Sequence, residues 1–273
     1  MLKGEAISAE FENQFYDLYR QFFRRAEDDR RWNVEKDIPW DKANPNVSDN
    51  IALIVESFMA VELFLPDYTS KILQLIRQSR GRAWFQANWG YEESKHSLVL
   101  EQWLLSSGKR TKKEIDAFAD AVLNQEWELP YPTARQMMIY TTFQELSTGL
   151  NYKNLRRKAI EQKDDALSTA LSFVARDESA HYQFFQDGVK LYLKADRDGT
   201  LRDIEHVLTT FRMPAQSLIP DWEHRGKTII GEKIFSDRIF FKDILRPVLN
   251  VLGTTRHELE ALAKTAPELI VPA

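Results

Sequence analysis

Hydrophobic positions recur in steps of three and four along most of the chain, a pattern typical of helices with one buried face. The pattern predicts four long helices over 49–79, 81–107, 132–162 and 164–195, a first helix over 8–28, and further helices over 232–250 and 254–265. Thr111 with Glu114 forms a capping-box pattern that predicts a shorter helix between the second and third long ones. No alternating run demands a sheet. The chain is therefore expected to form one all-α domain, residues 1–273, around a four-helix bundle at about 49–195.

Breaks in the periodicity mark the boundaries of this bundle. Residues 1–48 hold the first helix and an irregular segment, RWNVEKDIPWDKANPN, and Ser107-Gly108 closes the second long helix. After Asp198-Gly199 a broken region continues to about 231, so helices with irregular connections are expected over 200–273. Pro66 lies inside the first long helix and cannot donate a hydrogen bond to the carbonyl of Glu62, which predicts a bend or widening there. The alternative is a proline that the helix simply tolerates.

Each of the four long helices carries a carboxylate near the middle of its buried stripe. On two of them a histidine follows three residues later on the same face. An unpaired carboxylate in an apolar interior costs several kcal/mol or more, so these placements need an explanation. The six polar residues on the four stripes are Glu62, Glu93, His96, Glu145, Glu178 and His181.

Two divalent cations would neutralise the four carboxylates, and this ligand inventory is the one found in ferritin-like di-metal bundles. Oxygen and imidazole ligands without thiolate favour iron, with manganese as the alternative metal. A buried ion-pair network is the competing interpretation, but no lysine or arginine lies on these stretches of the stripes. His206 and His224 also follow an acid by three residues, and we interpret them as surface pairs.

Composition narrows the classes of function. The 273 residues include 37 Lys+Arg, 41 Asp+Glu and no cysteine, with a net charge of -4. Without cysteine there are no disulfides, thiolate zinc sites or iron–sulfur clusters, so electrons for redox chemistry must come from a partner. The charge balance gives no nucleic-acid signature, and the basic clusters RRAEDDRR, RQSRGR, KRTKK and RRK are interpreted as solvated helix faces. No apolar run approaches the roughly 18 residues of a membrane span, and the start MLKGEAISAE lacks signal-peptide character, so a cytoplasmic protein is expected.

Four segments carry a family resemblance. VELFLPDY, WGYEESKH, IYTTFQELST and ARDESAH, in this order and at these separations, resemble the soluble acyl-[acyl-carrier-protein] desaturases, from about Trp32 to about residue 200. The resemblance implies the same six metal ligands, two iron ions, and a cis double bond introduced into a fatty acyl chain on acyl carrier protein. It also implies O2, a ferredoxin-type electron donor and a homodimer. Met137, Met138 and Thr142 would set chain length in a narrow or adaptable tunnel, and a basic patch near its mouth would steer the acidic carrier.

The resemblance assigns further roles to three residues. It implies that Asp177 and Trp32 join the His96 side of the cluster as an electron route, with Asp177 accepting the second imidazole N–H. It also favours Thr148 as a hydroxyl acting in the oxygen-activating pocket. The alternatives are a solvent-facing acid for Asp177, ordinary packing for Trp32, and for Thr148 a core hydroxyl bonded back to its own helix.

Other proteins of this fold class remain as alternatives. A di-iron hydroxylase or N-oxygenase acting on a carrier-bound substrate is the main one, and an R2-like oxidase is another. In the small subunit of ribonucleotide reductase, a radical tyrosine usually stands where this chain has Leu100. Ferritin-like storage proteins tend to be shorter, and rubrerythrins use cysteine ligands that this chain lacks. A binding protein without catalysis is disfavoured because all six ligand positions are filled.

Overall fold

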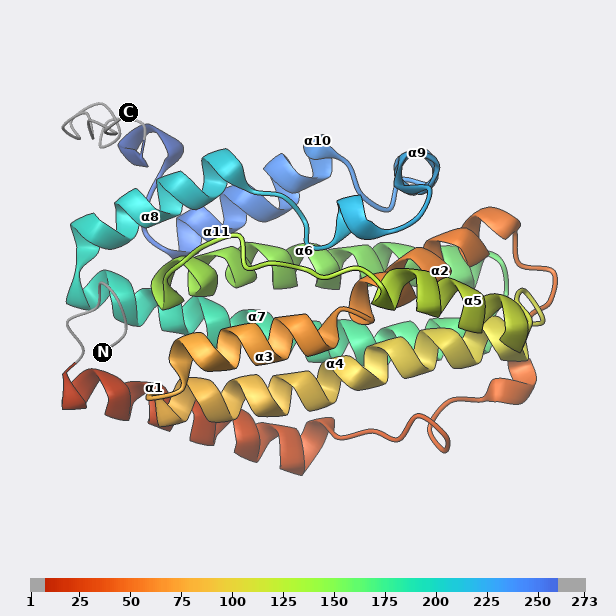
Figure 1. Cartoon of the computed structure of the whole chain (residues 1–273), viewed down its shortest axis with the longest axis horizontal. Coiled ribbons are helices and arrows are strands. Elements are labelled where there is room, and N and C mark those ends of the chain that lie inside the picture. The colour runs from red at the N-terminus through yellow and green to blue at the C-terminus, as the bar shows by residue number, and fades with distance from the viewer. Residues whose placement is uncertain (1–7, 260–273) are drawn as a thin grey trace.

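Four helical segments run side by side along the long axis of the molecule (Figure 1). The computed structural model describes residues 8–259, and within that range it contains helices and connections but no strand, which confirms the all-α prediction. No helix of this range is long and apolar enough to cross a membrane. The bundle consists of a broken helix, α2 (Asp49–Glu62) and α3 (Leu65–Ile76), followed by α4 (Arg80–Ser106), α6 (Ala134–Glu161) and α7 (Asp165–Ala195).

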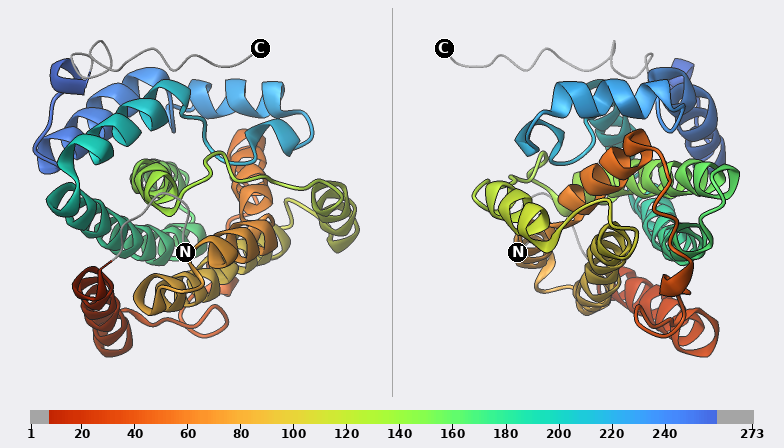
Figure 2. Two further views of the ribbon diagram at one scale, coloured as in Figure 1. Left: turned by 60° about the vertical axis from the view of Figure 1, so that its left-hand side comes forward. Right: turned by 90° about the vertical axis from the view of Figure 1, so that its right-hand side faces the viewer.

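The remaining helices cover the outside of this bundle. α1 (Ala9–Arg25) lies against α4 and α7, and α8 (Arg197–Thr210) packs on α6 and α7. The C-terminal helices lie on the α6 side (Figure 2). They are α9 (Trp222–Gly231), which contacts α2, and the continuous run of α10 (Asp237–Ile239), a π-helical segment (Phe240–Leu245) and α11 (Arg246–Val251).

The buried apolar side chains form two clusters, one toward each end of the bundle. One contains Phe15, Phe85 and Phe143, and the other contains Ile51 and Trp103. These side chains are at most 1% exposed. The six polar residues singled out from the sequence belong to neither cluster and lie on the helices between them. Apolar packing therefore shields the middle of the bundle from water at both ends.

The first bundle helix is interrupted at its functional position. The prediction of a single helix over 49–79 is wrong, because α2 ends at Glu62 and α3 begins at Leu65. The predicted disturbance at Pro66 is confirmed, since proline cannot donate the backbone hydrogen bond that would continue the helix. The phenolic hydroxyl of Tyr68 donates to the neighbouring carbonyl of Val61 (3.1 Å), which also accepts the backbone N–H of Phe64 (3.3 Å).

Several helix ends follow the local signals. The capping box of Thr111 and Glu114 is present at the start of α5 (Lys112–Leu123), and Gly108, with φ of 69°, follows α4. α1 ends at Arg25 and continues as a π-helical turn, Ala26–Arg30. This turn extends two residues past the predicted end at residue 28.

The C-terminal part is more regular than predicted. The broken region expected from Gly199 to about residue 231 is confined to residues 211–221, between α8 and α9. At the start of α8 the side chain of Asp196 accepts the N–H of Gly199 (3.0 Å). A Cβ at Gly199 would lie 2.0 Å from that carboxylate, so the glycine serves the helix cap and does not end a helix. The helix expected over 232–250 corresponds to 237–251. For the one expected over 254–265, residues 254 and 255 are not helical, residues 256–259 are helical, and residues 260–265 lie outside the described residues.

Gly81 allows α1 and α4 to approach closely, which gives a test of this packing. A Cβ at Gly81 would lie 2.5 Å from the backbone of Phe15 and Tyr16, whereas a Cβ at Gly231 would meet nothing within 4 Å. We expect Gly81→Ala to lower the free energy of unfolding by about 1–3 kcal/mol through overpacking. Gly231→Ala should stay within about 0.5 kcal/mol of the parent. Equal denaturation midpoints for the two variants would contradict this packing.

Candidate metal centre

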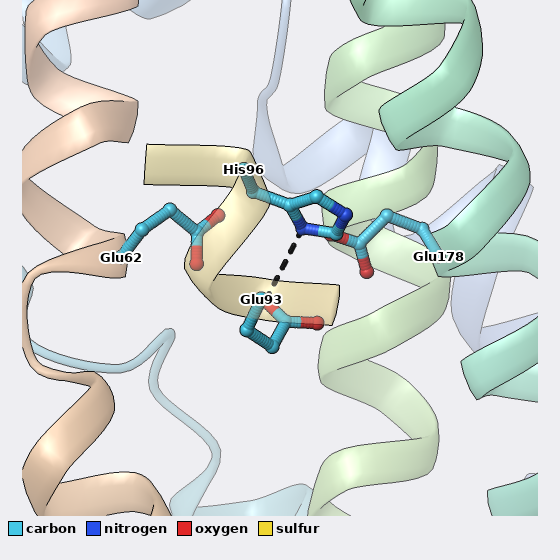
Figure 3. A group of neighbouring side chains, drawn as sticks. All are labelled: Glu62, Glu93, His96 and Glu178. Carbon is cyan, nitrogen blue, oxygen red and sulfur yellow. Dashed lines mark ion pairs between the residues drawn. The ribbon is translucent and has the colours of Figure 1, made fainter. Parts of the chain in front are cut away.

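The six residues predicted from the stripes meet in the middle of the bundle, and each is at most 5% exposed. They fall into two groups, each with ligand atoms within 4.8 Å of one another. One group is Glu62, Glu93, His96 and Glu178, and the other is Glu93, Glu145, Glu178 and His181. Figure 3 shows the first group, whose side chains come from α2, α4 and α7 and converge on one point. Two carboxylates, Glu93 and Glu178, belong to both groups and stand where they could bridge two cations.

Both imidazoles point the same ring nitrogen into the cluster. The Nδ1 atom of His96 lies 3.3 Å from carboxylate oxygens of both Glu93 and Glu178. The Nδ1 atom of His181 lies 3.0 Å from Glu93 and 3.3 Å from Glu145. This common orientation presents one lone pair of each ring to the shared space among the carboxylates. A neutral histidine that holds a metal ion does the same.

The inward-pointing atoms make no hydrogen bond of good geometry within the described residues. They are Glu93 Oε1, His96 Nδ1, Glu145 Oε2, both Glu178 oxygens and His181 Nδ1. Buried polar atoms are nearly always satisfied in native proteins, so this many in one place calls for a ligand. Divalent cations would accept these lone pairs and cancel the carboxylate charge. The donor set of oxygens and imidazole nitrogens fits iron or manganese.

Crowding shifts the acidities of the cluster in opposite directions. Burial, and then the neighbouring Glu93 carboxylate, raise the pKa of Glu62 and of Glu178 well above the ordinary value. Burial also acts to raise the pKa of Glu93, but the two histidines outweigh it and lower that pKa to about 2. Burial acts to lower the pKa of His96, yet the Glu93 charge raises it overall. The protein alone therefore retains protons among these groups, and a divalent cation must displace protons as it binds.

The outward nitrogens of the two histidines face a second pair of acids. His181 Nε2 lies 2.7 Å from Glu92, within hydrogen-bond distance. His96 Nε2 lies 3.6 Å from Asp177, so the hydrogen bond expected between them is not formed. A carboxylate behind a metal-ligating imidazole fixes the ring orientation and raises its basicity. Each outer acid immediately precedes the Glu-x-x-His motif of its own helix but faces the histidine of the opposite helix.

The segment before the bundle completes this outer layer. Trp32 Nε1 donates to Asp177 (2.7 Å), so the structure brings Trp32, Asp177 and His96 together as the resemblance implies. Asp177 is 1% exposed, which excludes the alternative of a solvent-facing acid. Arg30 donates to Asp177 (2.7 Å) and to Glu92 (2.9 Å) and joins the two outer acids. The proposed catalytic roles of Trp32 and Asp177 stay predictions.

Glu92 and Arg30 were missed from the sequence. The sequence predicts solvated helix faces for RRAEDDRR and RQSRGR. This prediction is wrong for Arg30 in the first cluster, which is 8% exposed, and for Arg82 in the second, which is 1% exposed. The acid before each Glu-x-x-His motif was the available signal for Glu92, since Asp177 stands at the equivalent place. His206 and His224 are exposed, as predicted.

Further side chains hold two of the carboxylates from outside. The hydroxyl of Tyr152 donates to Glu62 (2.6 Å), and Trp89 Nε1 donates to Glu145 (3.2 Å). Both rings lie on the buried stripes that predicted the cluster, but no role was assigned to either from the sequence. Directed hydrogen bonds of this kind fix carboxylates in orientation when they come from buried donors.

A cavity of about 220 Å³ adjoins the cluster on the side of Glu62. Thr148 and Tyr152 line it from α6, and the segment from Met213 to Asp237 supplies the opposite wall. The hydroxyl of Thr148 donates to the carbonyl of Gln144 (3.0 Å), the back-bonded arrangement given as its alternative. Its oxygen can still accept a hydrogen bond from the cavity.

A family model for fatty acid desaturases matches residues 26–271. The chain belongs to this fatty acid desaturase family. The match includes the C-terminal helices, so the prediction that similarity ends near residue 200 is wrong.

Two named proteins are similar to this chain at low sequence identity. DesA1 of Mycobacterium tuberculosis is 22% identical over 220 residues, covering 77% of this chain and 63% of that protein. The chloroplastic stearoyl-[acyl-carrier-protein] 9-desaturase of Helianthus annuus is 26% identical over 164 residues, 57% of this chain and 41% of the relative. The chain therefore matches less than two thirds of the length of either relative.

Solved structures show the same fold. DesA2 of Mycobacterium tuberculosis H37Rv superposes with a TM-score of 0.67 at 17% identity, covering 93% of this chain and 99% of that one. An R2-like ligand-binding oxidase with a reconstituted Mn/Fe cofactor gives a TM-score of 0.59 at 14% identity, covering 92% and 96% of the chains. The ferritin-like bundle predicted from the sequence is confirmed by these likenesses.

Metal uptake by two histidine variants tests whether the cluster binds cations. We expect the purified chain to bind about two Fe(II) or Mn(II) ions, because two ligand groups share Glu93 and Glu178. His96→Ala should weaken binding at least about tenfold by removing a ligand, and even a supporting residue of such a site typically matters 10–100-fold. His224→Ala, at an exposed acid-x-x-His motif, should leave binding unchanged. Anaerobic titration followed by metal analysis measures both, and equal uptake by the two variants would exclude this centre.

Proposed function

We propose that this chain is a di-iron, O2-dependent desaturase. It would introduce a cis double bond into a fatty acyl group carried by acyl carrier protein, with electrons from a ferredoxin-type donor and manganese as the alternative metal. Family membership supports the reaction class. The observation that carries the proposal is the convergence of two imidazole nitrogens and four buried carboxylates beside a cavity with mainly apolar walls. Such a cavity can hold the substrate carbon next to a pair of cations.

The reaction class follows from the chemistry of the bond to be broken. An unactivated methylene has no acidic proton, so general acid–base residues alone cannot remove its hydrogens. A bound iron pair supplies the dioxygen chemistry that such a step requires. The overall reaction balances, since the acyl chain, O2, two electrons and two protons give the alkene and two water molecules.

The protein's own residues hold the carboxylates, orient the histidines and exclude water. Tyr152 holds Glu62 through a hydrogen bond, while Arg30 neutralises the outer acids that orient the histidines. The apolar clusters above and below keep water from the centre. Thr148 would accept or relay a proton within the cavity, as the family resemblance implies.

The carrier protein would dock where the cavity reaches the surface. Exposed cations lie within one or two positions of its lining residues, namely Arg212 beside Met213, and Lys233 and Arg238 near Phe235 and Asp237. None of these three cations forms an ion pair within residues 8–259. They can therefore attract an acidic carrier, and such attraction weakens as salt rises.

A homodimer is supported by an exposed apolar stripe on α4. Trp84, Tyr91 and Leu98 recur every seven residues, and each is 50–54% exposed. Large side chains grouped on one helix face are typical of an interaction surface.

We expect Trp84→Glu to shift the full chain from two copies to one in light scattering. Ile160→Glu, on α6 and equally exposed (53%), is the control and should not change the mass. A monomeric parent protein would contradict the dimer.

A hydroxylase or N-oxygenase acting on a carrier-bound substrate is the second candidate. It is favoured by the polar side chains of Asn151, Gln216 and Ser236 in the cavity wall, which suit a substrate with heteroatoms. An R2-like oxidase is a weaker candidate that rests on the shared fold. Leu100, at the position of the radical tyrosine in the reductase subunit, is fully buried among apolar neighbours.

The mass of the product decides between these reactions. With iron, ferredoxin, its reductase and a panel of acyl-carrier proteins, we expect a product lighter by two hydrogens. A gain of one oxygen would support hydroxylation or N-oxygenation instead. The His96→Ala variant should give no product in the same assay. Unchanged substrate across the whole panel, with metal bound, would contradict the proposed function.

Replacing Thr148 by Val tests the hydroxyl at nearly constant volume. The ratio of hydrogen peroxide released to substrate consumed should rise several-fold, because proton delivery contributes roughly 10²–10⁴ in such steps. Thr142→Val is the control, because the buried hydroxyl of Thr142 donates to the carbonyl of Met138 and the residue does not line this cavity. An unchanged ratio in Thr148→Val would remove its proposed role.

A further inference from the structure

The two sides of the metal centre differ in the space that they leave. On the Glu62 side the cavity has a volume of about 220 Å³. On the opposite side, along α3 and the first half of α6, the spaces measure only about 10 and 20 Å³. Each of these holds one water molecule at most. A substrate can therefore reach the centre from the C-terminal helices, but it finds no room beyond.

Side chains fill most of the far side around α3 and the first half of α6. Met137 lines both small spaces, and Met138 packs so closely on α7 that a Cβ at Gly188 would lie 2.8 Å from its sulfur. The rings of Phe85 and Phe184 stack with centroids 3.5 Å apart in the same region. The narrow tunnel expected around the two methionines is thus a packed core in this structure.

One of the side chains that line the open cavity carries a buried polar atom without a hydrogen-bond partner among the described residues. Asn151 is 7% exposed and lines the cavity, and its Oδ1 atom makes no hydrogen bond within the described residues. Its neighbours Thr148 and Tyr152 both use their hydroxyls in bonds to the protein. A buried amide left unpaired destabilises the fold, so its retention points to a ligand that completes the bond.

We infer that this site takes a compact acyl group bearing a hydrogen-bond donor, a hydroxyl or an amide N–H, and not a long saturated chain. The donor would bond Asn151 Oδ1 while the reacting carbon lies beside Glu62. The thioester end would leave past the exposed Ile230 and Asp237, which form the outer part of the lining. The volume is below the roughly 300–1,000 Å³ of cavities for drug-sized ligands, which agrees with a short chain. This inference rests on the proposed function, in that a carrier delivers the acyl group.

Binding to the full-length chain tests the inference without turnover. Dye-labelled acyl carrier protein is loaded with hexanoyl, 3-hydroxyhexanoyl or stearoyl groups, and its dissociation constant is measured by fluorescence anisotropy. We expect the 3-hydroxyhexanoyl carrier to bind about tenfold more tightly than the hexanoyl carrier, the effect of one good hydrogen bond. The stearoyl carrier should bind no better than the unloaded carrier.

Two variants separate the polar contact from the size of the cavity. Asn151→Leu keeps the side-chain size and removes the amide, so the preference for the hydroxyl over the hexanoyl carrier should vanish. Asn124→Leu, at an exposed position after α5, is the control and should keep the preference. Met137→Ala removes a large side chain that lines both small spaces and should raise the affinity for the stearoyl carrier several-fold. Circular dichroism checks that each variant is folded. The comparison of the loaded carriers on the parent protein does not depend on the variants.

The outcomes distinguish this inference from the proposed function. Stearoyl binding as tight as hexanoyl binding in the parent, or a hydroxyl preference that survives Asn151→Leu, would overturn the inference and leave the carrier-dependent reaction standing. If no loaded carrier binds more tightly than the unloaded one, the proposed substrate delivery and this inference both fail.

Discussion

Four carboxylates buried together between two dry apolar clusters form the constraint on which this structure depends. Like charges at such distances in a low-dielectric interior repel strongly, so the cluster persists only where protons or cations compensate it. The inward turn of both imidazoles, the raised pKa of Glu62 and Glu178, and the unsatisfied oxygens all express the same condition. Part of the bundle core is thus a polar cluster that could hold cations.

The charges around this centre are arranged in layers of alternating sign. Outside the inner carboxylates stand His96 and His181, behind them the acids Asp177 and Glu92, and behind these Arg30. Each layer is stabilised by the next, because a buried charge without a partner is costly. A single guanidinium on the π-helical turn after α1 therefore connects the N-terminal segment to both α4 and α7.

Periodicity was sufficient to predict the bundle and the six converging residues, because both depend on which residues share a helix face. It could not predict Arg30, whose partners Glu92 and Asp177 are 62 and 147 positions away in sequence. The cavity was also beyond it, since the outer wall comes from irregular connections around α9. At Gly199 the prediction of a helix end was wrong, because a glycine required by a helix cap cannot be distinguished in sequence from one that ends a helix.

The break between α2 and α3 gives the ligands unequal mechanical support. Glu93, Glu145 and Glu178 sit within unbroken helices of 27–31 residues, where backbone displacement would strain hydrogen bonds on both sides. Glu62 is the last residue of α2, and Pro66 leaves its carbonyl free of a helical bond. Three of the four carboxylates therefore have rigid backbone support, and Glu62 has less. Glu62 is also the carboxylate that lines the cavity beside the cluster.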